Sequence, residues 1–308
     1  MNNMEEKMSS YSEFCALCDD IKCEYAVDVP LRDYTSFKIG GNADILVFPD
    51  SVSKVTAVAD YARANDIPLL VIGKGSNLLV SDDGFRGVVI NTCKMDEIYL
   101  LDETTVYCQS GASLSRLCRF ALENSLTGLE FAFGIPGTAG GAAYMNAGAY
   151  GGEMKDVLIC CEHITPDGRL AEFNADKLEL GYRHSVYSDS DYIILSLVLR
   201  LEKGDKNEIK AKMDDLMSRR KDKQPLEFPS AGSTFKRPEG YFAGALIEQC
   251  GLKGYTSGGA QVSEKHAGFV INRGGATAKD VLDVINHCKE TVYKETGVTI
   301  EPEVKIIG

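Results

Sequence analysis

The sequence predicts an α+β fold in two lobes. Short β-branched or aliphatic runs alternate with stretches in which apolar residues recur at helical spacing, and one pair of runs brackets a turn signal. A charged segment at 203–223 then separates a longer N-terminal part from a shorter C-terminal part. With 308 residues and 44% hydrophobic content, the chain is long enough for roughly two domains, each with its own core.

The N-terminal part opens with a β-α-β pattern. Residues 44–48 and 69–72 are strand-like, and the apolar residues Val52, Val55, Val58, Ala59 and Ala62 between them predict a helix. A later helix is expected over 113–124, and Pro166-Asp167-Gly168 favours a hairpin turn. The remaining strands of this part are expected at residues 87–90, 98–101, 106–109, 157–165, 170–173 and 192–201.

The C-terminal part begins after an amphipathic helix within 203–223, which links the two parts. We expect a helix at 241–250, a strand at 269–272 and a last strand at 299–307. Thr277 and Asp280 form a capping-box pattern, which predicts that a long helix begins there.

Composition excludes several classes of protein. The net charge of −12 disfavours a nucleic-acid binder, and no apolar stretch approaches the roughly 20 residues of a membrane span. The first residues lack the pattern of a signal peptide, so we expect a cytoplasmic protein with reduced thiols. Cys15, Cys18 and Cys23 fit a buried helical face better than a metal site, and no metal is expected. Adjacent Cys160 and Cys161 fit opposite faces of a strand.

Two glycine-rich stretches are the strongest binding signals. Gly73 and Gly75 follow a predicted strand, where glycine lets backbone amides approach a phosphate. The spacing is neither that of a P-loop nor that of a Rossmann fingerprint, and an ordinary tight turn is the alternative. The second stretch, 134–152, implies close approach to a bulky ligand or to another backbone. Together they suggest a large cofactor, with closely packed turns as the alternative.

Six motifs occur in order and resemble one family. They are Tyr34 to Gly41, Gly73 to Leu79, Gly134 to Gly151, Gly181-Tyr182-Arg183, Ala231 to Lys236, and Glu301-Pro302-Glu303-Val304. Together they resemble the UDP-N-acetylenolpyruvoylglucosamine reductase family, also called MurB, from about Tyr34 to the end of the sequence. The resemblance implies an FAD-binding fold of the PCMH or vanillyl-alcohol-oxidase type. It implies one subdomain within 1–90, a second at 91–204, and a separate α+β substrate-binding domain at 205–308.

The resemblance also implies the cofactors and their contacts. FAD is expected to bind noncovalently, because neither glycine stretch carries the His or Cys of a covalent flavin link, and NADPH is the expected reductant. The expected FAD-binding residues are Gly73, Lys74, Gly75, Ser76, Asn77, Leu78, Gly134, Ile135, Pro136, Gly137, Thr138, Gly140, Gly141, Ala142, Asn146 and Gly148.

Three further residues match the family's catalytic positions. The resemblance makes Ser233 the proton donor, Arg183 the ligand of the substrate carboxylate, and Glu303 the partner of the developing enolate. Read alone, Ser233 is an ordinary loop serine, and Arg183 and Glu303 could form a structural ion pair. Lys223, Lys236, Arg237 and His266 are expected to bind the sugar nucleotide, whereas His163, His184 and His287 are expected to be structural.

One departure from the family pattern indicates the subgroup to which the sequence is similar. Only four residues separate Tyr187 from Tyr192, so the tyrosine-bearing insertion that covers the substrate in one subgroup is absent, as in the shorter type II group. The expected activity is NADPH-dependent reduction of UDP-N-acetylglucosamine enolpyruvate to UDP-N-acetylmuramate. Two alternatives stay open: a flavin oxidase acting on another alcohol or sugar, and a noncatalytic nucleotide-binding module.

Overall fold

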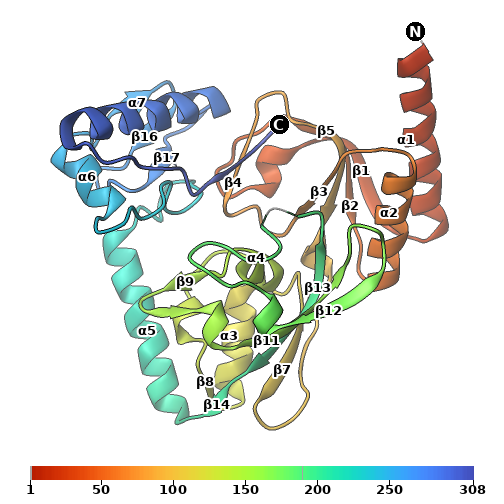
Figure 1. The fold of residues 1–308 in the computed structure, drawn as a ribbon, viewed down its shortest axis with the longest axis horizontal. Coiled ribbons are helices and arrows are strands. Elements are labelled where there is room, and N and C mark those ends of the chain that lie inside the picture. Colours follow the sequence, from red (N-terminus) through yellow and green to blue (C-terminus); the bar gives the residue numbers. More distant parts are fainter. Residues whose placement is uncertain (1, 189) are drawn as a thin grey trace. The chain divides into compact units, whose positions relative to one another are not determined.

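The computed structural model describes residues 2–188 and 190–308, and of the side chains before residue 10 nothing is described (Figure 1). Two compact units make up the chain, which passes between them several times. The first unit comprises residues up to Val27 together with Asp44–Lys74 and Gly87–Met217. The second unit comprises Asp28–Ala43, Gly75–Arg86 and Ser218–Gly308. The predicted mixture of helices and sheets is confirmed.

Helices occur at the places predicted within 52–62, 113–124, 203–223, 241–250 and after Thr277, whereas the helix over 139–144 had no prediction. The helices are α1 (Asn2–Asp20), α2 (Val52–Ala64), α3 (Leu114–Glu123), α4 (Ala139–Tyr144), α5 (Lys206–Lys223), α6 (Ala243–Gln249) and α7 (Ala278–Thr296). The strands are β1 (Glu24–Pro30), β2 (Asn42–Phe48), β3 (Leu69–Ile72), β4 (Leu78–Val80), β5 (Phe85–Asn91), β6 (Ile98–Leu100), β7 (Thr105–Gln109), β8 (Leu126–Thr127), β9 (Gly148–Ala149), β10 (Gly152–Glu153), β11 (Leu158–Ile164), β12 (Leu170–Asn174), β13 (Ile193–Arg200), β14 (Glu202–Lys203), β15 (Thr256–Ser257), β16 (Ala260–Val262), β17 (Val270–Asn272) and β18 (Lys305–Ile307).

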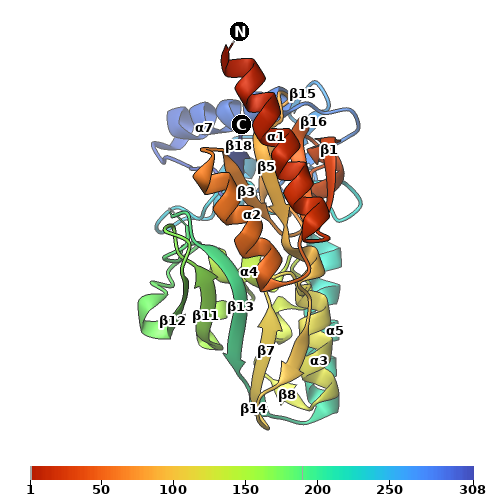
Figure 2. The same cartoon turned by 90° about the vertical axis from the view of Figure 1, so that its right-hand side faces the viewer.

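A five-stranded sheet in the order β12-β11-β13-β7-β6 forms one part of the first unit, and Figure 2 shows β12, β11, β13 and β7 side by side. The predicted hairpin is confirmed, since β11 and β12 pair antiparallel with Ile164 opposite Leu170. Buried residues of β7, β11 and β13 share one core with those of α3 and α4. This core supports the second glycine stretch, which contains α4.

A four-stranded sheet in the order β1-β2-β5-β3 accompanies α1 and α2. Val55, Val58, Ala59 and Ala62 of α2 are buried in its core, as their helical spacing predicts. Ser51 caps this helix, because its hydroxyl accepts a hydrogen bond from Lys54 N at 3.4 Å. The first glycine loop leaves this sheet at the end of β3.

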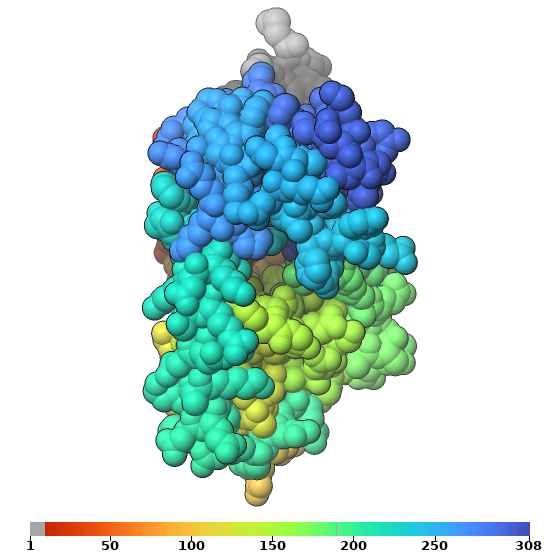
Figure 3. Space-filling view, turned by 90° about the vertical axis from the view of Figure 1, so that its left-hand side faces the viewer, coloured from red at the N-terminus to blue at the C-terminus, as the bar shows by residue number. Residues whose placement is uncertain are grey.

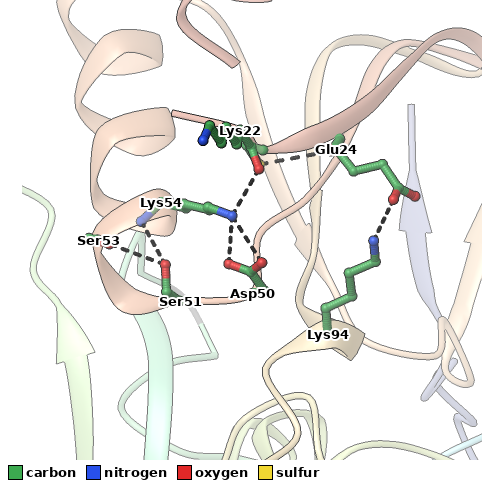
Figure 4. A network of polar contacts seen from close by, with 8 residues as sticks. Lys22, Glu24, Asp50, Ser51, Ser53, Lys54 and Lys94 are labelled. Carbon is green, nitrogen blue, oxygen red and sulfur yellow. Dashed lines mark hydrogen bonds and ion pairs between the residues drawn. The ribbon is translucent and has the colours of Figure 1, made fainter. Parts of the chain in front are cut away.

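A hydrogen bond joins the start of α2 to the turn after α1, and two ion pairs lie nearby (Figure 4). Lys54 Nζ donates to Lys22 O at 2.8 Å and to Asp50 Oδ2 at 2.9 Å. Lys94 Nζ lies 2.6 Å from Glu24 Oε2 on β1. Apart from Lys54, whose side chain is 20% exposed, these groups are largely exposed, so each ion pair contributes at most about 1 kcal/mol.

The second unit packs α7 against the three-stranded sheet β15-β16-β17. The predicted capping box is present: Asp280 N donates to Thr277 Oγ1 at 3.1 Å, and Thr277 N donates to Asp280 Oδ2 at 3.0 Å. The helix ends at Gly297, whose φ of +72° is the left-handed conformation that glycine adopts without strain.

The last strand is shorter than predicted. Residues 299–307 were expected to form one strand, but only Lys305–Ile307 do so, pairing parallel with β4. Pro302 has no backbone N–H for a ladder, and its neighbours pair instead with the Ser233 segment. The strands β1, β4, β8, β9, β10, β14, β15 and β16 had no prediction, because they are short or lack a clear alternation.

Helix α5 confirms the amphipathic segment. Ile209 and Met213 are buried, while most of its charged residues are exposed. Figure 3 shows the segment of this helix on the surface of the protein. Across the described residues, no helix combines the length and apolar character needed to cross a membrane. The short connection between Tyr187 and Tyr192 is described apart from Asp189, which lies outside the described residues.

Candidate active site

The Ser233 and Glu303 segments lie side by side in the second unit. Glu303 N donates to Thr234 O at 2.7 Å, and Lys236 N donates to Glu301 O at 2.8 Å. Between them, Phe235 and Pro302 form an isolated antiparallel bridge. Two of the three predicted catalytic residues therefore lie on paired backbones, one residue out of register.

Thr234 fixes the position of the exposed Ser233. Its side chain is buried, with Val270 N donating to Thr234 Oγ1 at 2.9 Å, and Thr234 N donates to Gly268 O at 2.8 Å. On the other side, Gly232 has a φ of +78°, which most L-residues adopt only with strain. Beyond Gly232, Ser230 forms an isolated bridge with Ile271, so the exposed Ser233 lies between two anchored positions.

The end of the first glycine loop contacts the Glu303 segment. Asn77 Nδ2 donates to Glu303 O at 3.1 Å, and Lys305 N donates to Asn77 O at 2.9 Å. Gly75 has a φ of +56°, and a Cβ there would lie 2.3 Å from Tyr34 O. The motifs at 34–41, 73–79, 231–236 and 301–304 are therefore neighbours in the fold, although the last lies over 200 residues beyond the second.

Arg183 belongs to the first unit, on a tight turn. Gly181 N donates to His184 O at 3.0 Å, and His184 N donates back to Gly181 O at 3.3 Å. Arg183 has a φ of +54°, an uncommon conformation for a residue with a side chain, so the surrounding structure must hold it. Its guanidinium donates to Gly148 O at 3.3 Å and lies 5.1 Å from the ring centre of Tyr182.

The glycines of the second stretch serve different purposes. A Cβ on Gly140 would lie 2.7 Å from Ser110 Cβ, and one on Gly148 would lie 2.7 Å from Glu153 Cβ and from Gly152 O. These two are glycine because protein packs against them, as the alternative interpretation proposed. Exposed Gly141 differs, since its nearest neighbour would be Thr138 Oγ1 at 3.5 Å. Space for a ligand remains at Gly141.

Polar groups suited to a phosphate or another polar ligand line these loops. Among the described residues, none accepts a hydrogen bond from the backbone amides of Lys74, Gly75 or Ser76. Ser110, beneath Gly140, also has a hydroxyl without a hydrogen-bond partner in the described part of the chain, but this hydroxyl is buried and does not face a ligand. Unpaired polar groups of this kind cost free energy unless a ligand or water satisfies them. The loops therefore fit the pyrophosphate-bearing cofactor implied above.

The other residues predicted to bind the cofactor lie around the start of α4. Thr138 caps this helix, with Gly141 N donating to its hydroxyl at 3.3 Å, and Ala142 is buried within it. Gly137 O accepts from Leu114 N at 3.2 Å. Gly73 faces the same cap, because a Cβ there would lie 2.3 Å from Thr138 Oγ1. The first glycine loop thus begins against the second glycine stretch within the first unit.

The four residues predicted to bind substrate all lie in the second unit. Lys223 is exposed at the end of α5, and Lys236 Nζ lies 3.7 Å from Glu301 Oε2. Arg237 stacks on Phe242, 3.8 Å from its ring centre. Burial lowers the pKa of His266, and its Nδ1 accepts from Gly268 N at 3.1 Å. His266 is therefore a neutral imidazole that carries its proton on Nε2.

Two features of the site had no functional prediction. Ser110 lay in an ordinary strand-to-helix connection, and nothing local distinguished it. Glu153 directly follows the second glycine stretch, and its carboxylate accepts a hydrogen bond from Asn146 within that stretch. The sequence does not reveal this contact, because the two residues meet only when β9 and β10 pair as a hairpin.

Comparison with families of known proteins gives two matches. Residues 43–174 match the model of an FAD binding domain. Residues 224–307 match the C-terminal domain of UDP-N-acetylenolpyruvoylglucosamine reductase. The first match contains both glycine stretches, and the second contains the segments of Ser233 and Glu303.

Several individual proteins resemble nearly the whole chain. UDP-N-acetylenolpyruvoylglucosamine reductase of Pediococcus pentosaceus is 51% identical over 279 residues, which cover 91% of this chain and 93% of the relative. The protein of the same name from Clostridium perfringens is 49% identical over 303 residues, covering 98% and 99%. The crystal structure of the MurB protein of Thermus caldophilus aligns with a TM-score of 0.78 at 34% identity, covering 93% of this chain and 99% of that chain.

Proposed function

The chain belongs to the UDP-N-acetylenolpyruvoylglucosamine reductase family, and from this premise we propose how its residues reduce UDP-N-acetylglucosamine enolpyruvate to UDP-N-acetylmuramate. This reaction supplies a precursor of peptidoglycan, with NADPH as the reductant. The pairing of the Ser233 and Glu303 segments carries the proposal, because it brings the backbones of the two residues together, one residue out of register.

The reaction adds a hydride to one alkene carbon and a proton to the carbon next to the carboxylate. When bound, FAD supplies the hydride, after NADPH has reduced it. The protein must orient the enolpyruvyl carboxylate, stabilise the charge that develops on it, and deliver the proton. A cation, a carboxyl group and a short acid meet these three requirements.

Ser233 is the proposed proton donor. Its hydroxyl proton passes to the carbon next to the carboxylate, which leaves an alkoxide that must regain a proton. A free serine hydroxyl is a weak acid, so nearby groups must stabilise that alkoxide. Lys236, three residues along the same segment, or an ordered water is the source of the returning proton.

Arg183 and Glu303 are proposed to act on the carboxylate of the substrate. The guanidinium of Arg183 donates two parallel hydrogen bonds to it and stabilises the enolate-like charge. Glu303 is proposed to hold or protonate the same oxygen system. Its position relative to Ser233 is supported by the hydrogen bond of Glu303 N to Thr234 O at 2.7 Å.

The remaining assignments follow the fold. FAD is held by the glycine loops at 73–78 and 134–148, except for the side chain of Asn146, which binds protein instead. The sugar nucleotide is held by Lys223, Lys236, Arg237 and His266. We propose FAD-binding subdomains at 1–90 and 91–204 and a substrate-binding domain at 205–308. The protein works in the cytoplasm, where NADPH and the sugar nucleotide are available, and it acts without nucleic acid or membrane insertion.

Rapid anaerobic mixing tests the proposal in two steps. NADPH should bleach the flavin of the purified protein, and the enolpyruvyl nucleotide should then restore the colour. We expect ping-pong kinetics, with the two substrates using one flavin face in turn. Bleaching without recovery by the nucleotide, together with rapid turnover of oxygen, would identify an oxidase instead. A protein that shows no flavin absorption after FAD addition would identify a noncatalytic binding module.

A further inference from the structure

Asn146 is a buried asparagine whose side chain joins three separate pieces of the first unit. Its Nδ2 donates to Gly181 O at 2.9 Å and to Glu153 Oε2 at 2.7 Å. Its Oδ1 accepts from Lys155 N at 2.9 Å. The residue is 0% exposed and has a φ of +41°, a left-handed conformation that asparagine adopts more readily than most residues, just after the end of α4.

These contacts occupy both N–H groups of the Asn146 amide. An asparagine side chain has two N–H donors and one carbonyl oxygen, and here each N–H faces a separate acceptor. An aspartate would place a second carboxylate against Glu153, and an apolar residue would leave buried polar groups unpaired. The Asn146 amide therefore has no N–H group left to donate to FAD, although the resemblance implied that Asn146 contacts this cofactor.

Glu153 is itself held in place. Its carboxylate forms an ion pair with Lys155, and Glu153 N donates to Asp156 Oδ2 at 2.9 Å as part of a capping box. Its backbone pairs with Gly148 between the short strands β9 and β10. A Cβ on Gly148 would collide with Glu153, so the two strands approach closely only because residue 148 is glycine.

Residues 146–148 hold the Arg183 turn at two points. Asn146 binds Gly181 O, at the start of the turn, and Gly148 O accepts from the guanidinium of Arg183 at 3.3 Å. Arg183 has a φ of +54°, a conformation that persists only where its surroundings enforce it. We propose that Asn146 and Glu153 are positioning residues, which hold the guanidinium of Arg183 where it meets the carboxylate of the substrate. The proposal rests on the proposed function of Arg183.

The first test uses Asn146→Ala and Glu153→Gln in the holoenzyme. Both variants should keep FAD and be reduced by NADPH at rates within about threefold of the wild type. Oxidation of the reduced enzyme by the enolpyruvyl nucleotide should slow by about 10- to 100-fold in Asn146→Ala, because small displacements of a catalytic group have effects of this size. Glu153→Gln should slow it less, since its amide oxygen still accepts from Asn146.

Asn124→Ala is the matched control. The Asn124 amide also donates to a main-chain carbonyl, Phe120 O at 2.8 Å, but at the end of α3. Its removal should leave both half-reactions within about threefold of the wild type.

In flavin-free protein, hydrogen exchange at the amide of Lys155, which donates to Asn146, should accelerate in Asn146→Ala and stay unchanged in Asn124→Ala.

A double-mutant cycle separates positioning from a general structural effect. If Asn146 acts through Arg183, its substitution should have little further effect on substrate reduction in an Arg183→Ala background. Additive losses would overturn the proposal, and so would loss of FAD or equal slowing of both half-reactions in Asn146→Ala. Should that variant fail to fold, wild-type rates in Glu153→Gln would contradict the proposal equally well. An Arg183→Ala enzyme with normal substrate reduction would instead refute the proposed function of Arg183.

Discussion

Ser233 shows how little a single residue reveals by itself. In the sequence it is a loop serine with a low expectation of catalysis. In the structure it is an exposed hydroxyl between Gly232, with its positive φ, and the buried Thr234. Such anchoring suits a group that must meet a substrate at one defined position. The catalytic role itself stays a proposal.

We expect Ser233→Ala to separate the two half-reactions. Reduction of the flavin by NADPH should proceed as in the wild type, because that step needs no proton from Ser233. Reduction of the enolpyruvyl nucleotide should slow by at least about 100-fold, the lower end of what proton transfer from a positioned group contributes. Stopped-flow absorbance of the flavin measures both steps.

Ser257→Ala is a suitable control for this prediction, since Ser257 lies on β15 in the same unit and has no proposed role. It should leave both rates unchanged. If Ser233→Ala slowed both half-reactions to the same extent, the serine would have a role in folding or flavin binding rather than in proton transfer.

His163 makes stability depend on pH. It is fully buried on β11, its Nδ1 lies 3.1 Å from Tyr187 Oη, and its ring lies 4.3 Å from that of Phe173. Burial lowers the pKa of His163, so the folded protein binds its proton less readily than the unfolded chain does, whose His pKa is about 6.5. The stabilisation is therefore fully present above about pH 6.5 and is lost as the pH falls toward the folded pKa.

Urea denaturation at pH 7.5 and at pH 5.0 checks this expectation. The free energy of unfolding of the wild type should decrease on acidification by more than that of His163→Phe, which keeps a ring among its aromatic neighbours. The exposed His184→Asn should retain the decrease of the wild type. An equal decrease in the wild type and His163→Phe would mean that other groups cause it.

At the scale of elements, α4 contains both a glycine that packs against protein and a glycine that is proposed to face the ligand. Gly140 packs against Ser110, whereas exposed Gly141 has room for a Cβ, with its nearest neighbour at 3.5 Å. Alanine is favoured over glycine within a helix by about 0.5–1 kcal/mol. Without a cofactor, position 141 would therefore tolerate alanine.

Gly141→Ala should accordingly leave the flavin-free protein as stable as the wild type, or slightly more stable, and weaken FAD binding by about tenfold or more. Gly140→Ala should instead destabilise the flavin-free protein, because its Cβ would lie 2.7 Å from Ser110 Cβ. Thermal unfolding and fluorescence titration with FAD measure the two effects. Unchanged FAD affinity in Gly141→Ala would place the cofactor away from α4.

The elements also show where prediction from sequence succeeds. Helices α2, α3, α5 and α7 follow from apolar periodicity and from caps such as Thr277 with Asp280, because these signals lie within a few residues of one another. The last strand was predicted too long. Its first half pairs with the Ser233 segment through a single bridge, and local alternation carries no information about that distant partner.

For the molecule as a whole, FAD should be a large contributor to stability. The two proposed FAD-binding loops come together only in the folded chain, where a Cβ on Gly73 would lie 2.3 Å from Thr138 Oγ1, so the ligand binds only the folded state. A ligand at 100 times its dissociation constant adds about 2.7 kcal/mol to the free energy of unfolding. The melting temperature should therefore rise with FAD concentration.

Riboflavin, which lacks the pyrophosphate, provides the matched comparison. At equal concentration it should raise the melting temperature much less than FAD, because the amides of Lys74, Gly75 and Ser76 would have no phosphate to bind. Equal stabilisation by the two flavins would show that these amides do not bind the cofactor.

The sequence by itself determined the fold class, most helices and strands, and the family, since six motifs in fixed order identify it. Tertiary structure alone decided which motifs become neighbours and what each glycine and asparagine does. Asn77 meets Glu303 across 226 residues, and Asn146 meets Gly181 across 35. Periodicity and capping act between residues a few positions apart, whereas these hydrogen bonds exist only after distant segments have packed together. The support of the Arg183 turn by Asn146 therefore became visible only in the folded chain.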